Sequence, residues 1–190
     1  MKLRNQRLVF KICLLGLNLA LYFALSFLSL AIGVTRISFT GIPVMFISIL
    51  YGPLEGILVA GLGEFFYQLT AYGLVPQTPL WLIAPIARAL IVGLLLRHKN
   101  IKDHIPLWVF TTILSCLVVT AANTFSLWIT GYLYEINEKP LYVIILIRAG
   151  TSIVTAVMYG ILMPAFFEPL IKSGKLELTE EPKKPKEKLE

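Results

Sequence analysis

The stretch LWLIAPIARALIVGLLLRH, residues 80–98, decides the class of fold. Before Arg97 it carries a single charged residue, Arg88, and most of its other side chains are aliphatic. This length and composition are typical of a transmembrane α-helix, which needs roughly 20 apolar residues. An ionisable side chain costs at least about 2.5 kcal/mol at the centre of a lone membrane helix, so Arg88 calls for a functional or structural reason.

The rest of the chain is similarly apolar. Of its 190 residues, 57% are hydrophobic and 15% are charged, and the mean hydropathy is +0.78. We expect an all-α membrane protein with a six-helix transmembrane bundle in residues 1–171, followed by a disordered, charged cytoplasmic tail in residues 172–190. The expected helices span about residues 8–32, 42–51, 54–72, 79–97, 105–132 and 140–170.

The positive charges of the loops predict the orientation in the membrane. Lysines and arginines gather at the N-terminus, in the connection RHKNIKDH (97–104) and in the tail, which share one side of a six-helix bundle. The connections on the opposite side hold only Arg36 and Lys139. Positive loops favour the cytoplasmic side, so we expect a multi-pass protein of the bacterial cell membrane with both termini in the cytoplasm.

Three ionisable residues lie within the expected helices: Glu64, Arg88 and Arg148. At 1.5 Å per residue, each lies roughly 12 to 14 Å below the outer surface, so the three could share one site. One interpretation is that Glu64 pairs with an arginine in a buried bridge that only orders the bundle. The second arginine would then be left without a counter-charge, which is costly in hydrocarbon. A ligand carboxylate, which arginine can hold with two hydrogen bonds, would complete the balance of charge.

Polar and aromatic side chains occupy the same outer half of the bundle. Gln68 follows Glu64 by one helical turn, and Trp81 marks the mouth of the fourth helix. Arg36, in the first outer loop, could belong to a lid or to the membrane interface. We therefore expect an outward-facing ligand pocket. Its expected ligand-binding residues are Arg36, Glu64, Gln68, Trp81, Arg88, Asn123, Trp128 and Arg148.

The residue patterns of enzymes and metalloproteins do not occur. Cys13 and Cys116 lie within expected helices without the spacing of a zinc site, and we interpret them as packing residues. His98 and His104 lie in a cytoplasmic connection, and no G-x-x-x-x-G-K-[ST] phosphate loop is present. We expect a protein that is not an enzyme and that uses no metal, cofactor or nucleic acid.

Small residues recur every fourth position on the first helix, at Gly16, Ala20 and Ala24. This spacing lets another helix backbone approach closely within lipid. Packing within the same bundle is the simplest interpretation of such a face.

The segment RISFTGIPVMFISILYGPLEGILVAGLGEFFYQL, residues 36–69, follows the pattern R-I-x-F-x-x-I-P, then G-P-x-x-G, then G-[DE]. Together with the chain length, the six expected helices and an Ala-x-x-x-Ala element at Ala20 and Ala24, it resembles the substrate-binding S component of energy-coupling factor (ECF) vitamin transporters, in the folate and pantothenate branch. The matching residues are Arg36, Ile37, Phe39, Ile42, Pro43, Gly52, Pro53, Gly56, Gly63 and Glu64.

The resemblance implies a high-affinity binding subunit of an ECF-type ABC importer for a water-soluble vitamin. An ECF transmembrane coupling subunit would dock on Gly16, Ala20 and Ala24, and two cytoplasmic ATPase subunits would hydrolyse ATP. The ligand site would be formed by the first outer loop and the outer halves of the later helices.

Two vitamins and one other class of protein fit these features. Folate binders of the branch usually carry F-P-G-F-T before the fourth helix, where this chain has VPQTPLWLIAP (75–85). We therefore expect pantothenate, a small monocarboxylate with hydroxyl groups, and keep folate as the alternative. A cell-shape scaffold of the MreD type has a comparable topology, but it would not need an outward-facing charged pocket.

Overall fold

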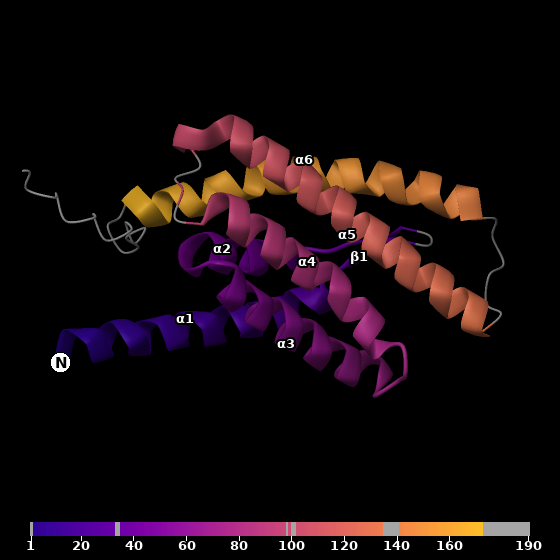
Figure 1. The fold of residues 1–190 in the computed structure, drawn as a ribbon, viewed down its shortest axis with the longest axis horizontal. Coiled ribbons are helices and arrows are strands. Elements are labelled where there is room, and N and C mark those ends of the chain that lie inside the picture. The colour runs from indigo at the N-terminus through magenta and orange to yellow at the C-terminus, as the bar shows by residue number, and fades with distance from the viewer. Residues whose placement is uncertain (1, 33–34, 98, 100–101, 135–140, 173–190) are drawn as a thin grey trace, which may run out of the picture.

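The computed structural model describes residues 2–32, 35–97, 99, 102–134 and 141–172. Six α-helices form most of this part of the chain, and a two-stranded antiparallel hairpin and a short 3-10 turn complete it (Figure 1). The elements are α1 (Lys2–Phe27), β1 (Leu30–Ile32), β2 (Thr35–Ile37), α2 (Gly41–Tyr51), α3 (Pro53–Tyr72), α4 (Thr78–Leu96), η1 (Lys102–His104), α5 (Ile105–Tyr134) and α6 (Leu141–Lys172).

The predicted six-helix bundle is confirmed. Four helices, α1, α4, α5 and α6, contain apolar runs long enough to cross a bilayer. α2 has only 11 residues, and α3 has 20 residues but includes Glu55, Glu64 and Gln68, which lower its hydropathy. The predicted tail lies outside the described residues, except for Lys172 at the end of α6.

The prediction for the end of the first helix is wrong. α1 ends at Phe27, and the chain then forms the hairpin, in which Leu30 of β1 pairs with Ile37 of β2. β-branched residues such as Ile32 and Thr35 favour the extended conformation. Because the strands are as apolar as the helix before them, hydropathy alone does not show where one gives way to the other.

The short helix α2 is buried by α1, α3, α4 and α6 and turns directly into α3. Gly52 makes the turn with φ of 112°, a conformation that favours glycine, and Pro53 begins α3. The corner packs closely on α4, because a Cβ atom at Gly93 would lie 2.5 Å from the Pro53 backbone. The α2–α3 corner therefore anchors the middle of the bundle.

The start of α1 and the end of α6 lie at the same end of the bundle (Figure 1). Near this end, Lys11 of α1 forms an ion pair with Glu55 at the start of α3, with 2.5 Å between Nζ and Oε1. The same Nζ lies 5.2 Å from the centre of the Tyr51 ring. α1, α3 and α5 run away from this end, and α4 and α6 run back towards it. The last turns of α1, α3 and α5 therefore meet the first turns of α4 and α6 at the far end.

Candidate functional site

A cavity of about 480 Å³ lies in the far half of the bundle. Its walls are formed by the last turns of α1, the second half of α3, the first half of α4, α5 from its middle onward and the first half of α6. The loop between β2 and α2 also contributes. The volume falls in the range of roughly 300–1,000 Å³ that is typical of small-molecule sites.

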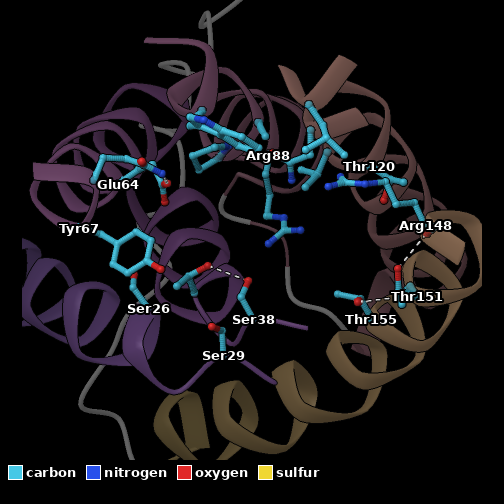
Figure 2. Close-up of a pocket in the computed structure, with 18 of the residues that line it drawn as sticks. Ser26, Ser29, Ser38, Glu64, Tyr67, Arg88, Thr120, Arg148, Thr151 and Thr155 are labelled. Atoms are coloured by element: carbon cyan, nitrogen blue, oxygen red, sulfur yellow. Dashed lines mark hydrogen bonds between the residues drawn. The ribbon is translucent and has the colours of Figure 1, made fainter. Parts of the chain in front are cut away.

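Six of the eight predicted ligand-binding residues line this cavity. Figure 2 shows Glu64 and Arg148 on opposite sides of it, with the Arg88 side chain between them and pointing inward. Within the described part of the chain, no group of three or more His, Cys, Asp or Glu side chains could hold a metal ion. The six lining residues are Glu64, Gln68, Trp81, Arg88, Asn123 and Arg148.

The two other predicted residues are Arg36 and Trp128. Arg36 lies in β2, where it pairs with Ala31, but its side chain is outside the described part of the structure. Trp128 is 46% exposed and packs against Phe125, with 6.3 Å between the ring centres. Five residues after Asn123, it lies about 140° around the helix from that residue, and it is not among the residues that line the cavity.

Tyr22 and Gln68 both donate hydrogen bonds to the carboxylate of Glu64. Tyr22 of α1 donates its hydroxyl to Oε2 at 2.8 Å, and Gln68 donates its amide nitrogen to Oε1 at 2.7 Å. Tyr22 is 1% exposed, and its ring lies so close to α3 that a Cβ atom at Gly63 would be 2.5 Å from it. Both donors also line the cavity, so Glu64 is set in a wall of hydrogen-bonding groups.

Arg88 is buried, and its guanidinium is placed by an aromatic residue of α6. Nη1 donates to the hydroxyl of Tyr159 at 3.3 Å, and the guanidinium carbon lies 4.9 Å from the centre of the Tyr159 ring. The Nε donor of Arg88 is buried without a hydrogen-bond partner among the described residues. Arg88 also lines the cavity, so its guanidinium brings a positive charge to the wall.

Arg148 lies in the first half of α6 among hydroxyl groups. Thr151 donates to the Arg148 carbonyl oxygen at 3.0 Å, and Thr155 donates to the Thr151 carbonyl oxygen at 2.7 Å. These two threonines and Thr120 of α5 line the cavity near Arg148 (Figure 2). This side of the cavity therefore combines a cation with hydroxyl groups, whereas the opposite side carries the carboxylate of Glu64.

Sequence reasoning missed much of the wall. The α5 contribution could have been found from spacing, because positions 116, 119, 120, 123, 127 and 130 recur every three or four residues along one helix face. Cys116, interpreted as a packing residue, is 2% exposed and lines the cavity as well. The missed lining residues with a hydroxyl or thiol group are Tyr22, Ser26, Ser29, Ser38, Thr40, Tyr72, Cys116, Thr120, Thr130, Thr151, Ser152 and Thr155.

The small residues of α1 lie on the outside of the bundle. Gly16, Ala20 and Ala24 are all exposed, and a Cβ atom at Gly16 would have no neighbour within 4 Å. The interpretation that this face packs within the bundle is therefore wrong for the described residues. The face remains open to lipid or to a partner helix.

Comparison with known proteins places this chain in a family. A family model described as "ECF-type riboflavin transporter, S component" matches residues 8–172. The chain belongs to this family. A solved structure described as FolT bound with folic acid has the same fold, with a TM-score of 0.61 and 20% sequence identity over 80% of this chain and 88% of that chain. No curated protein matches the sequence.

This membership confirms the predicted resemblance to the S component of an ECF vitamin transporter. The protein is a multi-pass membrane transport subunit and not an enzyme. S components of this family work with an ECF transmembrane subunit and ATPases. Transport is thus favoured over the scaffold alternative.

Proposed function

We propose that this S component binds a water-soluble vitamin that has an anionic tail and a flat, hydrogen-bonding ring, and that folate fits this description best. One observation carries the proposal: a single cavity holds the carboxylate of Glu64 on one side and the buried guanidinium groups of Arg88 and Arg148 towards the other. A complementary ligand has N–H donors at one end and carboxylates at the other.

The arginines favour a negatively charged ligand. Arg88 is 6% exposed and Arg148 is 9% exposed, and Glu64 is the single acidic residue among the described residues that line the cavity. Two positive charges and one negative charge leave a net charge of +1. A carboxylate can take two parallel hydrogen bonds from a guanidinium, which offsets the cost of burying it. The glutamate tail of folate brings two such carboxylates.

Glu64 favours a ligand with N–H donors. Its oxygens accept hydrogen bonds from Tyr22 and Gln68, and a carboxylate oxygen can accept more than one. The aminopyrimidinone edge of a pteridine ring carries adjacent N–H donors of this kind. Tyr67 and Trp81 also line the cavity and offer aromatic faces on which a flat ring can stack.

The other two vitamins use fewer of these groups. Pantothenate, which the sequence favoured, has one carboxylate and no ring, so it would bring a single carboxylate to the two arginines and would not stack on the aromatic side chains. Riboflavin, which the description of the family names, is uncharged and would give neither arginine an anion. The solved neighbour is described as bound with folic acid, which supports the preference for folate.

Binding to the purified protein in detergent tests the proposal. We expect folic acid to raise the unfolding temperature, because a ligand at 100 times its Kd adds about 2.7 kcal/mol to the free energy of unfolding. Folic acid diamide, in which both carboxylates are carboxamides, should stabilise the protein much less. Stabilisation by pantothenate or riboflavin, without stabilisation by folic acid, would overturn the choice of folate.

The exposed face of Gly16, Ala20 and Ala24 supports docking of an ECF transmembrane coupling subunit on α1, with two ATPases on the cytoplasmic side. Lys11 near the start of α1 and Lys99 after α4 lie at the end of the bundle that holds both described chain ends. Their charges support an orientation in which this end is cytoplasmic and the cavity lies in the outer half.

A further inference from the structure

Tyr159 of α6 is absent from the cavity wall but contacts a residue that belongs to it. Its side chain is 0% exposed and is not one of the lining residues. The ring lies against the guanidinium of Arg88, at 4.9 Å from centre to carbon, and the hydroxyl accepts a hydrogen bond from Nη1 at 3.3 Å. Tyr159 therefore acts on Arg88 from outside the cavity.

The same hydroxyl also holds the loop between β2 and α2. It donates to the carbonyl oxygen of Ser38 at 2.6 Å and accepts the backbone N–H of Gly41 at 3.1 Å. Ser38 and Thr40, whose hydroxyl oxygens lie 3.1 Å apart, line the cavity. One phenol thus joins α6, the arginine of α4 and a loop that forms part of the cavity wall.

The close approach of these three parts leaves Arg88 little freedom. A Cβ atom at Gly41 would clash with Nη1 of Arg88 and would lie 2.6 Å from the Tyr159 hydroxyl. Because Nε of Arg88 has no hydrogen-bond partner among the described residues, Tyr159 supplies the hydrogen bond that the structure gives to this guanidinium. A change at Tyr159 should therefore reach the ligand through Arg88.

We propose that Tyr159 is a positioning residue for ligand binding, which orients the Arg88 guanidinium towards the ligand carboxylate and ties it to the loop at Ser38–Gly41. This inference rests on the proposed anionic ligand. Tyrosine suits the role because its ring attracts a cation while its hydroxyl both donates and accepts. Phenylalanine would keep the ring and lose all three hydrogen bonds.

A double-mutant cycle tests whether Tyr159 acts on the ligand through Arg88. Affinities for folic acid and for its diamide are measured by titration with the parent protein, Tyr159→Phe, Arg88→Gln and the double variant. We expect Tyr159→Phe to bind folic acid about tenfold more weakly, the scale for loss of a hydrogen bond to a charged group. The loss should be much smaller for the diamide and should vanish in the Arg88→Gln background. Tyr142→Phe, at an exposed tyrosine of the same helix, should bind like the parent.

A purely structural role predicts a different pattern. Tyr159→Phe would then weaken folic acid and the diamide equally, and its effect would add to that of Arg88→Gln. Either of these results, or unchanged binding of folic acid by Tyr159→Phe, would overturn the inference. If the parent itself fails to bind folic acid, the proposed ligand is wrong, and the same cycle measured on thermal unfolding tests the link by itself: additive losses would then refute it.

Discussion

The hydroxyl of Tyr22 in α1 lies 2.8 Å from Oε2 of Glu64 in α3, where it donates a hydrogen bond at the edge of the cavity. Ala20 and Ala24, two residues before and after Tyr22, are exposed on the outside of the same helix. One helix therefore carries the support of the candidate ligand site on its inner side and the candidate docking face on its outer side. A shift of α1 on docking would therefore change the hydrogen bond between Tyr22 and Glu64.

Replacing the Glu64 carboxylate should weaken binding more than removing its support. Glu64→Gln replaces one acceptor oxygen with a donor, so we expect at least about a tenfold loss of affinity for folic acid. Tyr22→Phe removes a single hydrogen bond and should cost less. Calorimetric titration measures both, with Glu168→Gln near the other end of α6 as the control. Equal affinity in Glu64→Gln and the parent would contradict a ligand contact at Glu64.

Each buried arginine should contribute to binding of an anionic ligand. Arg88→Gln and Arg148→Gln should each weaken folic acid about tenfold or more, because a charge-assisted hydrogen-bond pair is lost. Arg97→Gln, at an exposed arginine at the end of α4, is the matched control and should leave affinity unchanged. If only one of the two buried arginines matters, a ligand with one carboxylate such as pantothenate would be favoured instead.

Larger side chains on the outer face of α1 should abolish transport and leave ligand binding intact. Ala20→Leu and Ala24→Leu should abolish vitamin uptake by cells that express the complete transporter, because a larger side chain keeps a partner helix away. Binding to the isolated protein should stay within about twofold of the parent, since neither alanine lines the cavity. Ala149→Leu, at an exposed alanine of α6, should leave uptake intact. Normal uptake by both α1 variants would rule out docking at this face.

The contact between α1 and α3 should be sensitive to one added methyl group. A Cβ atom at Gly63 would lie 2.5 Å from the Tyr22 ring, so Gly63→Ala should lower the free energy of unfolding by about 1 to 3 kcal/mol. Gly150→Ala meets no atom within 4 Å and should leave stability unchanged or slightly higher. Thermal unfolding in detergent compares the two. An equally stable Gly63→Ala protein would mean that α1 is free to move away from α3.

The charged residues of the cavity could be predicted from the sequence, but the contacts that they make could not. Glu64, Arg88 and Arg148 could be assigned to one site because depth in a membrane helix follows from counting residues. Depth says nothing about rotation around the helix axis, which turns Trp128 away from the side of Asn123. The hydrogen bonds that Tyr22 and Gln68 donate to Glu64, and that Arg88 donates to Tyr159, required the structure.

The amino-acid sequence by itself determined a membrane-embedded bundle of six helices and the polar residues within it, because hydropathy and helical length are local properties of the chain. Only the tertiary structure decided which of those residues meet. Tyr22 and Glu64 are 42 positions apart, and Tyr159 and Arg88 are 71 apart. Their contacts depend on how each helix is rotated and crossed against its neighbours, which follows from packing along whole helices. The hairpin after α1 was also visible only in the tertiary structure, where its strands pair with each other and β2 packs against α6.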